Sequence, residues 1–506
     1  MAAFFDEIHS TQGTIFLLTV AVGLLVYLLI RSWNGKRYAP GPVGLPVLGN
    51  LLSIGKDPTA SYDKWWSQYG DVFRIRLGSW EAVVINGYRT IKAAADQKDD
   101  FSGRPGFIAQ NMIKEINGDH HIAFGPFDSV YREQRKIAAT VLRRFTGKEK
   151  DRTEDLLKKE SNILADTLLS KSKGSPVNVI ADVQFGIGRV VYKFMYGRFM
   201  GDPDDDDHLT EIKKMIDGTN KFSEFVKNGN PVDVIPVLRF VFPNHLLKLK
   251  QLLTDTVRVT QTLLSNRVVN FRVNDVKDVT DAAFEGELTK GGDQAKVVLK
   301  LTAVLTDIHG ASIDTTSRAL QWLILYMAEY PDIQERVRQE IGNHIDQERD
   351  VCYKDSARLV YTEATIYETL RVAVPIPFCV PKAATRDTTI NGYDVDKDTV
   401  VIFNLRSASF EKSFWGDPGQ FRPERLITAD NTLDDTKLSH IIPFSLGRRN
   451  CVGELFAKME LFVIFSTLIR RCRFMKPNDI VYDFTPDPGL TYMPKDFKVI
   501  VEPPSK

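Results

Sequence analysis

FSLGRRNCVG, residues 444–453, places one cysteine in a turn that contains two glycines and leads directly into a long apolar run. Gly447 and Gly453 permit a close approach of the backbone. The two arginines and the N-terminus of the following helix would favour the thiolate form of Cys451. The apolar run reads as a buried helix. The pattern therefore predicts a sulfur with a chemical task at the start of a core helix.

Two uses of such a thiolate compete. A lone cysteine is most often a small buried hydrophobic residue, so its surroundings must decide. A nucleophile needs a nearby base and an oxyanion site, and residues 441–450 contain no histidine. An axial haem ligand needs a protected thiolate, backbone N–H groups around the sulfur and a cation for the propionates. The stretch provides these three features, although a distant histidine leaves the nucleophile open.

Composition excludes several classes of protein. The 506 residues are 43% hydrophobic, which is enough for one large domain or two ordinary ones. Lysine and arginine number 66 against 65 aspartates and glutamates, so no broad basic field is available for nucleic acid. The four cysteines form no CxxC pair, which argues against a disulfide framework or a zinc site.

The N-terminus carries an uncharged stretch, residues 13–30, which at about 1.5 Å per residue nearly crosses a hydrocarbon layer of about 30 Å. Arg31, Lys36 and Arg37 follow it, whereas Asp6 and Glu7 precede it. The positive-inside rule then predicts a luminal N-terminus and a cytosolic body. A cleavable signal peptide would need a basic start and a small-residue cleavage site, so we expect a retained single-pass anchor over residues 1–31.

A basic hinge rich in proline and glycine, residues 32–50, separates the anchor from the catalytic domain, residues 51–506. Residues 71–87 read as a β-hairpin, and residues 129–144, 151–169 and 297–330 read as helices, the last closed by Pro331. The apolar, proline-broken stretch at residues 230–243 either dips into a membrane surface or packs as a loop. We expect a mostly α, α+β domain with small sheets.

The turn also fits the pattern F-x-x-G-x-R-x-C-x-G at Phe444, Gly447, Arg449, Cys451 and Gly453. This pattern resembles the haem loop of cytochrome P-450 monooxygenases. The resemblance implies the cytochrome P-450 fold and heme b, iron protoporphyrin IX, with an axial thiolate from Cys451. It also implies that the five matching residues bind the cofactor.

Three further motifs occur in the order of that family. Glu368 and Arg371, with Arg425 further along, resemble its buried Glu-Arg-Arg network, which we read as a structural lock because buried charges must be paired. Asp314 and Thr315 resemble its acid-alcohol pair, with Ser312 where the family usually has glycine.

Contacts to the haem propionates are the third resemblance. Tyr131 and Arg135 stand where the family has Trp-x-x-x-Arg, and tyrosine can donate a hydrogen bond as tryptophan does. Lys382 stands where relatives often hold a cation for the propionates. We therefore expect these three side chains to bind the cofactor.

The resemblance covers the whole chain and is nearest to the animal microsomal branch, on the side of steroid 17-alpha-hydroxylase and aryl-hydrocarbon hydroxylase. It implies insertion of one oxygen atom from O2 into a hydrophobic substrate such as a steroid, lipid or polycyclic xenobiotic. Asp314 and Thr315 would be the catalytic residues that deliver protons. Residues 101–127, 374–379 and 489–492 would contact the substrate.

Electrons would come from NADPH through cytochrome P-450 reductase, with cytochrome b5 as a further donor, at the endoplasmic reticulum membrane. The sequence has no GxGxxG in a βαβ context, which agrees with an external electron source. Arg132, Arg448, Arg449 and Lys458 would form the docking face. Two alternatives are a haem-thiolate isomerase or dehydratase that needs no O2, and a non-catalytic haem-binding protein.

Overall fold

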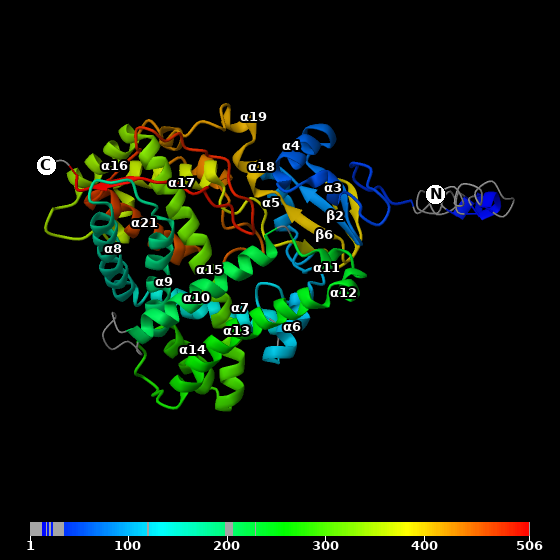
Figure 1. Ribbon diagram of the computed structural model, residues 1–506, viewed down its shortest axis with the longest axis horizontal. Coiled ribbons are helices and arrows are strands. Elements are labelled where there is room, and N and C mark those ends of the chain that lie inside the picture. Colours follow the sequence, from blue (N-terminus) through cyan, green and yellow to red (C-terminus); the bar gives the residue numbers. More distant parts are fainter. Residues whose placement is uncertain are drawn as a thin grey trace.

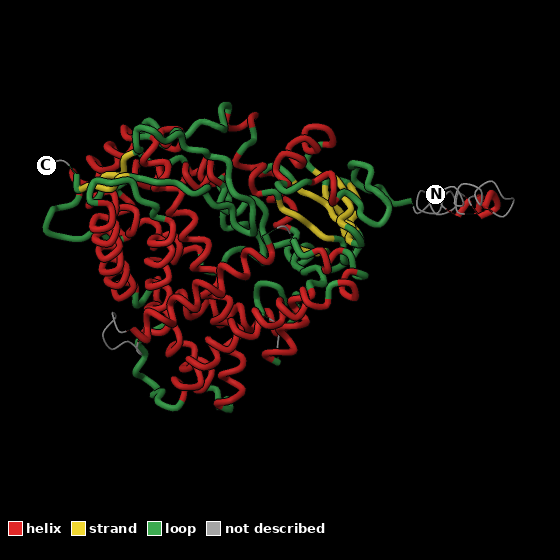
Figure 2. Tube along the Cα trace, in the orientation of Figure 1, coloured by secondary structure: helices red, strands yellow, loops and turns green. Residues whose placement is uncertain are grey.

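The computed structural model describes residues 13–16, 18–19, 22–23, 35–118, 121–197, 206–227 and 229–504. Helices dominate these residues, as Figure 2 shows. They are α3 (Leu51–Ile54), α4 (Pro58–Tyr69), α5 (Tyr88–Asp96), α6 (Ile108–Asn117), α7 (Ser129–Thr146), α8 (Lys150–Ser172), α9 (Ile180–Tyr196), α10 (Asp206–Val226), α11 (Pro231–Val234), α12 (Leu238–Val241), α13 (Pro243–Val268), α14 (Val279–Leu288), α15 (Gln294–Glu329), α16 (Pro331–His344), α17 (Val360–Ala373), α18 (Leu405–Ser409), α19 (Lys412–Trp415), α20 (Asp435–His440) and α21 (Glu454–Arg471), with short 3-10 turns η2 (Tyr353–Ala357) and η3 (Pro423–Leu426).

Helix α15 is the long central element of the helical region (Figure 1). The side chain of Asp293 caps its start by accepting a hydrogen bond from the backbone N–H of Lys296. It ends before Pro331, which forces the preceding residue out of helical geometry and begins α16. Helices α7, α9, α13, α14, α17 and α21 pack around it, so most of its faces are buried.

A four-stranded sheet lies at the other end of the molecule (Figure 1). Its strand order is β1 (Val72–Leu77), β2 (Trp80–Ile85), β6 (Val400–Phe403) and β3 (Lys382–Ala383). Strands β1 and β2 form the predicted antiparallel hairpin, whereas β2 and β6 run parallel with Val83 opposite Val401. The sheet therefore joins a segment before the helices to one that follows most of them.

Two further sheets have two strands each, β4 (Thr388–Ile390) with β5 (Tyr393–Val395), and β7 (Arg473–Met475) with β8 (Ile500–Glu502). The prediction of a mostly helical domain with small sheets is confirmed. The predicted anchor, residues 1–31, falls mostly outside the described residues. Among the described residues, no helix combines the length and the apolar character that crossing a membrane requires.

Candidate haem site

The cysteine turn is a closed loop between α20 and α21. The backbone N–H of Cys451 donates to the carbonyl oxygen of Phe444 over 2.9 Å. Gly447 has a φ of +81°, and a Cβ atom there would lie 3.2 Å from the Ala95 carbonyl oxygen. Any larger residue at position 447 would strain the turn and press it against α5. The loop geometry therefore explains this glycine.

The Cys451 side chain is accessible, although the protein packs closely around the loop that carries it. Burial raises the pKa of the Cys451 thiol, while a hydrogen bond from the Gly453 N–H and the charge of Arg135 lower it. The expectation that both loop arginines favour the thiolate was wrong, because Arg448 pairs with Asp99 at 3.3 Å and is exposed. A bound metal cation would supply the missing stabilisation of the thiolate.

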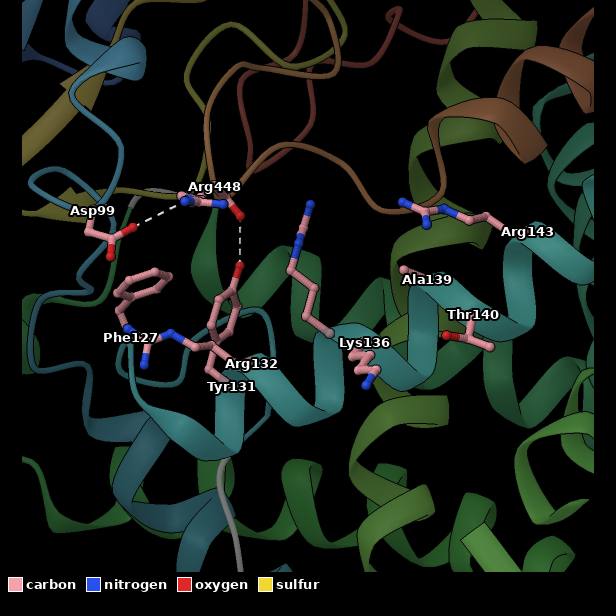
Figure 3. A pocket seen from close by; sticks show the side chains of 10 residues that line it. Asp99, Phe127, Tyr131, Arg132, Lys136, Ala139, Thr140, Arg143 and Arg448 are labelled. Carbon is pink, nitrogen blue, oxygen red and sulfur yellow. Dashed lines mark hydrogen bonds and ion pairs between the residues drawn. The ribbon is translucent and has the colours of Figure 1, made fainter. Parts of the chain in front are cut away.

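Helix α7 holds the cysteine loop from one side, as Figure 3 shows for Tyr131. The Tyr131 hydroxyl donates to the Arg448 carbonyl oxygen over 2.9 Å, and Arg135 Nη2 donates to Asn450 Oδ1 over 2.6 Å. The sequence led us to expect both side chains on the propionates. In the structure both side chains hold the cysteine loop, and their contact with the propionates stays a prediction.

Arg449 points into the protein. Its Nε, Nη1 and Nη2 atoms donate to the carbonyl oxygens of Ser102, Ile122 and Gly125 over 2.8, 2.9 and 2.7 Å. The guanidinium lies 3.7 Å from the ring centre of Tyr131, and burial lowers the pKa of Arg449 to about 9. This position removes Arg449 from the predicted docking face, which must be exposed.

Two more cations lie beside it, the buried Lys382 and the half-buried Arg104. Lys382, in β3, donates from Nζ to Cys379 Sγ over 3.2 Å, and burial lowers the pKa of Lys382. Arg104 donates to the carbonyl oxygens of Ala123 and Val380 over 2.7 and 2.9 Å, and burial lowers the pKa of Arg104 to about 10. Sequence reasoning missed Arg104 as a cofactor residue, because nothing in FSGRP marks an arginine that binds carbonyl groups 19 and 276 residues further along the chain.

Arg104, Lys382 and Arg449 form what we call the acid-free cation cluster. Arg104 and Arg449 each lower the pKa of Lys382, and Arg104 lowers that of Arg449, so the three lie in one region. The more distant charges of Asp307 and Asp128 raise the pKa of Arg104 and Arg449, respectively. Among the described residues, no carboxylate lies within ion-pair distance of any of the three. Buried cations need an anion, and the two propionates of haem would supply one. The residues present therefore fit a haem held by Cys451 and this cluster.

Helix α15 presents an accessible stripe on an otherwise buried surface. Asp307, Ala311 and Thr315 follow at intervals of four residues and are each at least partly exposed. The Thr315 hydroxyl donates to the Ala311 carbonyl oxygen over 2.8 Å, and the Ser312 hydroxyl donates to that of Ile308 over 2.8 Å. Ser312 thus turns its hydroxyl back onto the helix, which leaves the groove nearly as open as glycine would.

Asp314 lies off this stripe and is buried. Its Oδ2 accepts a hydrogen bond of 2.6 Å from the Thr491 hydroxyl, and its Oδ1 lies 3.3 Å from Arg318 Nη2. The acid and the alcohol therefore have separate surroundings, since neighbouring helix positions point about 100° apart. Thr491 lies in a segment expected to contact the substrate, and its partnership with Asp314, 177 residues earlier, had no local signal in the sequence.

The Glu-Arg-Arg network is buried between α17 and η3. Glu368 accepts two hydrogen bonds from Arg371, of 2.7 and 2.8 Å, and one of 3.0 Å from Arg425. The two arginines also donate to backbone carbonyls at Ser409, Trp415, Asp417, Pro418 and Gln420. The structure brings the three predicted residues together, and they fix residues 409–425 to α17.

A model of the Cytochrome P450 family matches residues 39–501. Curated relatives include Cytochrome P450 1A2 of Felis catus, 31% identical over 95% of this chain and 96% of the relative. Cytochrome P450 1A1 of Macaca mulatta is 31% identical with the same coverage, and Cytochrome P450 1A2 of Mus musculus is 32% identical over 94% of this chain and 95% of the relative. The chain therefore belongs to the cytochrome P-450 family and is a haem-binding oxidoreductase of the monooxygenase type.

Proposed function

We propose that this chain inserts one oxygen atom from O2 into a hydrophobic substrate, using two electrons from NADPH that reach it through a reductase. Substrate, O2, two electrons and two protons give hydroxylated substrate and water. One observation carries the proposal: an accessible cysteine lies in one fold with the acid-free cation cluster, in which Lys382 and Arg449 are buried and Arg104 is half-buried. That combination fits a thiolate-bound haem and no disulfide or zinc site.

A thiolate-bound haem supplies dioxygen activation when it is in place. Cys451 provides the sulfur, and the Gly453 N–H donates to it. Arg104, Lys382 and Arg449 provide positive charge for the propionates. Tyr131 and Arg135 support the site by hydrogen bonding to the loop that carries Cys451. Phe444 and Gly447 shape that loop, the first by accepting the Cys451 N–H through its carbonyl oxygen.

Proton delivery falls to α15. The Thr315 hydroxyl is on the accessible stripe, where it can donate a hydrogen bond to the oxygen that is being activated. Asp314, next to Thr315 on the helix, is the carboxylate that we propose as the source of the protons. An isomerase or dehydratase that consumes no O2 would have no use for this pair.

The substrate class is supported by aromatic side chains, two in the expected segment 101–127 and one in α10. Phe107, Phe124 and Phe222 come from three different elements and contact one another edge to face, with ring centres 5.6 and 5.8 Å apart. All three are partly exposed. Ala123, next to Phe124, donates its N–H to Asp307 Oδ2 over 2.8 Å, which places the rings beside the stripe of α15. Such a wall favours flat, apolar substrates such as polycyclic aromatics or steroids.

An acidic electron donor fits a basic face behind the cysteine loop. A surface cavity of about 610 Å³ is lined by Arg132, Arg135, Lys136, Arg143 and Arg448 from α7 and the loop, with Asp99 as its one acid (Figure 3). Lys458, expected to belong to this face, is half-buried and paired with Glu454 at 2.7 Å. We therefore assign docking to the α7 cations instead.

The docking assignment is tested by charge reversal. Lys136→Glu should lower the rate of reductase-supported turnover severalfold at low salt, and added salt should reduce the difference from wild type. Lys159→Glu, an exposed change on α8 away from the cavity, is the matched control. Equal salt dependence in the two variants would contradict the assignment.

A membrane location is supported by two exposed apolar segments. Val43 is 97% exposed and Phe240, in α12, is 86% exposed. Both segments attach to the turn of the β1–β2 hairpin, where Gly78 donates to the Leu48 carbonyl oxygen and Ser79 to that of Val234. They gather at the end where the N-terminal chain leaves (Figure 1). We place the domain on the cytosolic face of the endoplasmic reticulum membrane, with residues 1–31 as the anchor.

The central experiment is the carbon-monoxide difference spectrum of the reduced protein. A thiolate-type Soret band is expected for wild type and should be lost in Cys451→Ser, whereas Cys352→Ser and Cys472→Ser should retain it. Titration with steroids and polycyclic aromatics should then identify a ligand through a spin-state shift. A band typical of histidine ligation, or NADPH-independent turnover without O2, would contradict the proposed function.

A further inference from the structure

We propose that Thr491 is a positioning residue for proton delivery, because its hydroxyl holds the Asp314 carboxylate in place on α15. This inference rests on the proposed monooxygenase function and extends it to a residue in the C-terminal loop, residues 487–493. It assigns the hydroxyl of Thr491 a task that a nonpolar side chain of equal size cannot perform.

The hydrogen bond is short and fully buried. Thr491 Oγ1 donates to Asp314 Oδ2 over 2.6 Å, and both residues are about 95% buried. A hydrogen bond to an ionised acceptor is roughly twice as strong as one between neutral groups. It therefore fixes which carboxylate oxygen faces the loop and which one remains for other partners.

The second carboxylate oxygen is held less firmly. Arg318 Nη2 lies 3.3 Å from Asp314 Oδ1, but Oδ1 is buried and accepts no hydrogen bond of good geometry from the described residues. Arg318 instead donates from Nη1 to Gln321 Oε1 over 3.3 Å, and Gln321 donates to the Ile180 carbonyl oxygen. Arg318 thus balances the charge of Asp314 while Oδ1 keeps an unused lone pair. An acid that passes protons needs such a free site.

The loop does not need the Thr491 hydroxyl for its own anchoring. The Asp487 N–H donates to the Met493 carbonyl oxygen, and Tyr492 N–H donates to that of Pro375. The Trp322 indole N–H, also from α15, donates to the Tyr492 carbonyl oxygen over 3.0 Å. Because three other hydrogen bonds hold the loop, the bond to Asp314 has its main effect on the carboxylate.

The chemistry shows why the position matters. Each turnover consumes two protons with the two electrons, and electrons that arrive without protons in time leave as reduced oxygen instead of product. A carboxylate that rotates away from Thr491 would deliver protons late. The measurable result is a lower yield of product per NADPH consumed.

The test compares three variants of the full-length protein with its reductase. Thr491→Val removes the hydroxyl at nearly constant volume, and Thr491→Ser restores it. Thr302→Val is the matched control, a buried threonine on α15 whose hydroxyl donates only to the Val298 carbonyl oxygen. Product per NADPH should fall about tenfold in Thr491→Val, the equivalent of one hydrogen bond to a charged group. Thr491→Ser and Thr302→Val should remain near wild type.

Two further readouts separate positioning from a loss of structure. With hydrogen peroxide as the source of oxygen and electrons, substrate and peroxide give product and water with no outside protons, so Thr491→Val should match wild type. In an Asp314→Asn background, Thr491→Val should cause no further loss, because Thr491 acts through Asp314. Additive losses, equal loss in the peroxide reaction, or failure of serine to rescue would each overturn the inference.

The outcomes also distinguish this inference from the proposed function. If wild type lacks the thiolate-type spectrum or makes no product with NADPH and O2, the proposed function fails and the inference fails with it. If wild type is active and Thr491→Val is fully coupled, only the inference fails. If Thr491→Val binds no haem, product per NADPH is compared between Thr491→Ser and Asp314→Asn instead. An equal loss in these two variants contradicts the proposal.

Discussion

Two groups of buried cations differ in whether the protein supplies their anion. Arg371 and Arg425 share Glu368, and all three are buried. In the second group Lys382 and Arg449 are buried and Arg104 is half-buried. Among the described residues no carboxylate lies within ion-pair distance of the three, and burial lowers the pKa of each. The comparison shows that the first group has its charges neutralised by the protein itself and stabilises the fold. The second group is complete only with an external anion.

The largest effect is expected where the internal anion is removed. Glu368→Gln leaves Arg371 buried without an acid and Arg425 with only the half-exposed Asp417, which should lower the free energy of unfolding by about 3–5 kcal/mol in urea titrations. Glu424→Gln, on the same segment but exposed and paired with Arg336, should cost about 1 kcal/mol or less. Equal losses in the two variants would break the distinction between buried and exposed acids.

Glu460, on α21, is the opposite case, a buried acid without a cation. Neither of its oxygens makes a hydrogen bond of good geometry within the described chain, and burial raises the pKa of Glu460 to about 8. The folded state then binds an extra proton between about pH 4.5 and pH 8, so the stabilisation present below pH 4.5 is lost as pH rises through 8. Glu460→Gln should gain on the order of 3 kcal/mol in unfolding free energy at pH 8 and almost nothing at pH 5. Parallel pH curves would contradict the assignment.

A smaller effect is expected at Lys382, where one substitution should change both the stability of the haem-free protein and the rate of haem loss. Lys382→Met removes a buried charge that lacks an internal anion, so the haem-free protein should become more stable by about 1 kcal/mol. The same change should speed transfer of haem to apomyoglobin about tenfold, because one charge-assisted contact is lost. Lys382→Arg keeps the charge and serves as control. Slower haem transfer in Lys382→Met would show that the cluster does not bind the cofactor.

The smallest effect on stability is expected at the exposed ion pair between Arg448 and Asp99. Arg448 and Asp99 are each more than half exposed and lie 3.3 Å apart. Asp99→Asn should change the free energy of unfolding by less than about 0.5 kcal/mol and leave haem transfer unaltered. A larger change would mean that Asp99 contributes to the cofactor site through the cysteine loop.

The sequence predicted the features that depend on neighbouring residues. Pro331 ended α15 where expected, and the Gly78–Ser79 turn formed the β1–β2 hairpin. The haem loop and the Glu-Arg-Arg residues were identified through their resemblance to motifs of the cytochrome P-450 family. These signals are local because caps, turns and short motifs act within a few residues.

Contacts between distant segments could not be predicted in this way. The contacts of Arg104 and Thr491, and those of Tyr131 and Arg135 with the cysteine loop, all depend on partners that only the folded chain brings close. Arg449 shows the limit most clearly. The motif marks its position, but its direction into the protein depends on carbonyl groups more than 320 residues earlier.

That direction has an experimental use. Because Arg449 grips the backbone at Ile122 and Gly125, the cysteine loop and this segment cannot shift independently. The segment around Ile122 and Gly125 is thereby connected mechanically to the cysteine loop, which would hold a strongly absorbing haem. Small movements near Phe124 should be visible as colour changes, so binding to that wall can be followed by eye or spectrometer without a label.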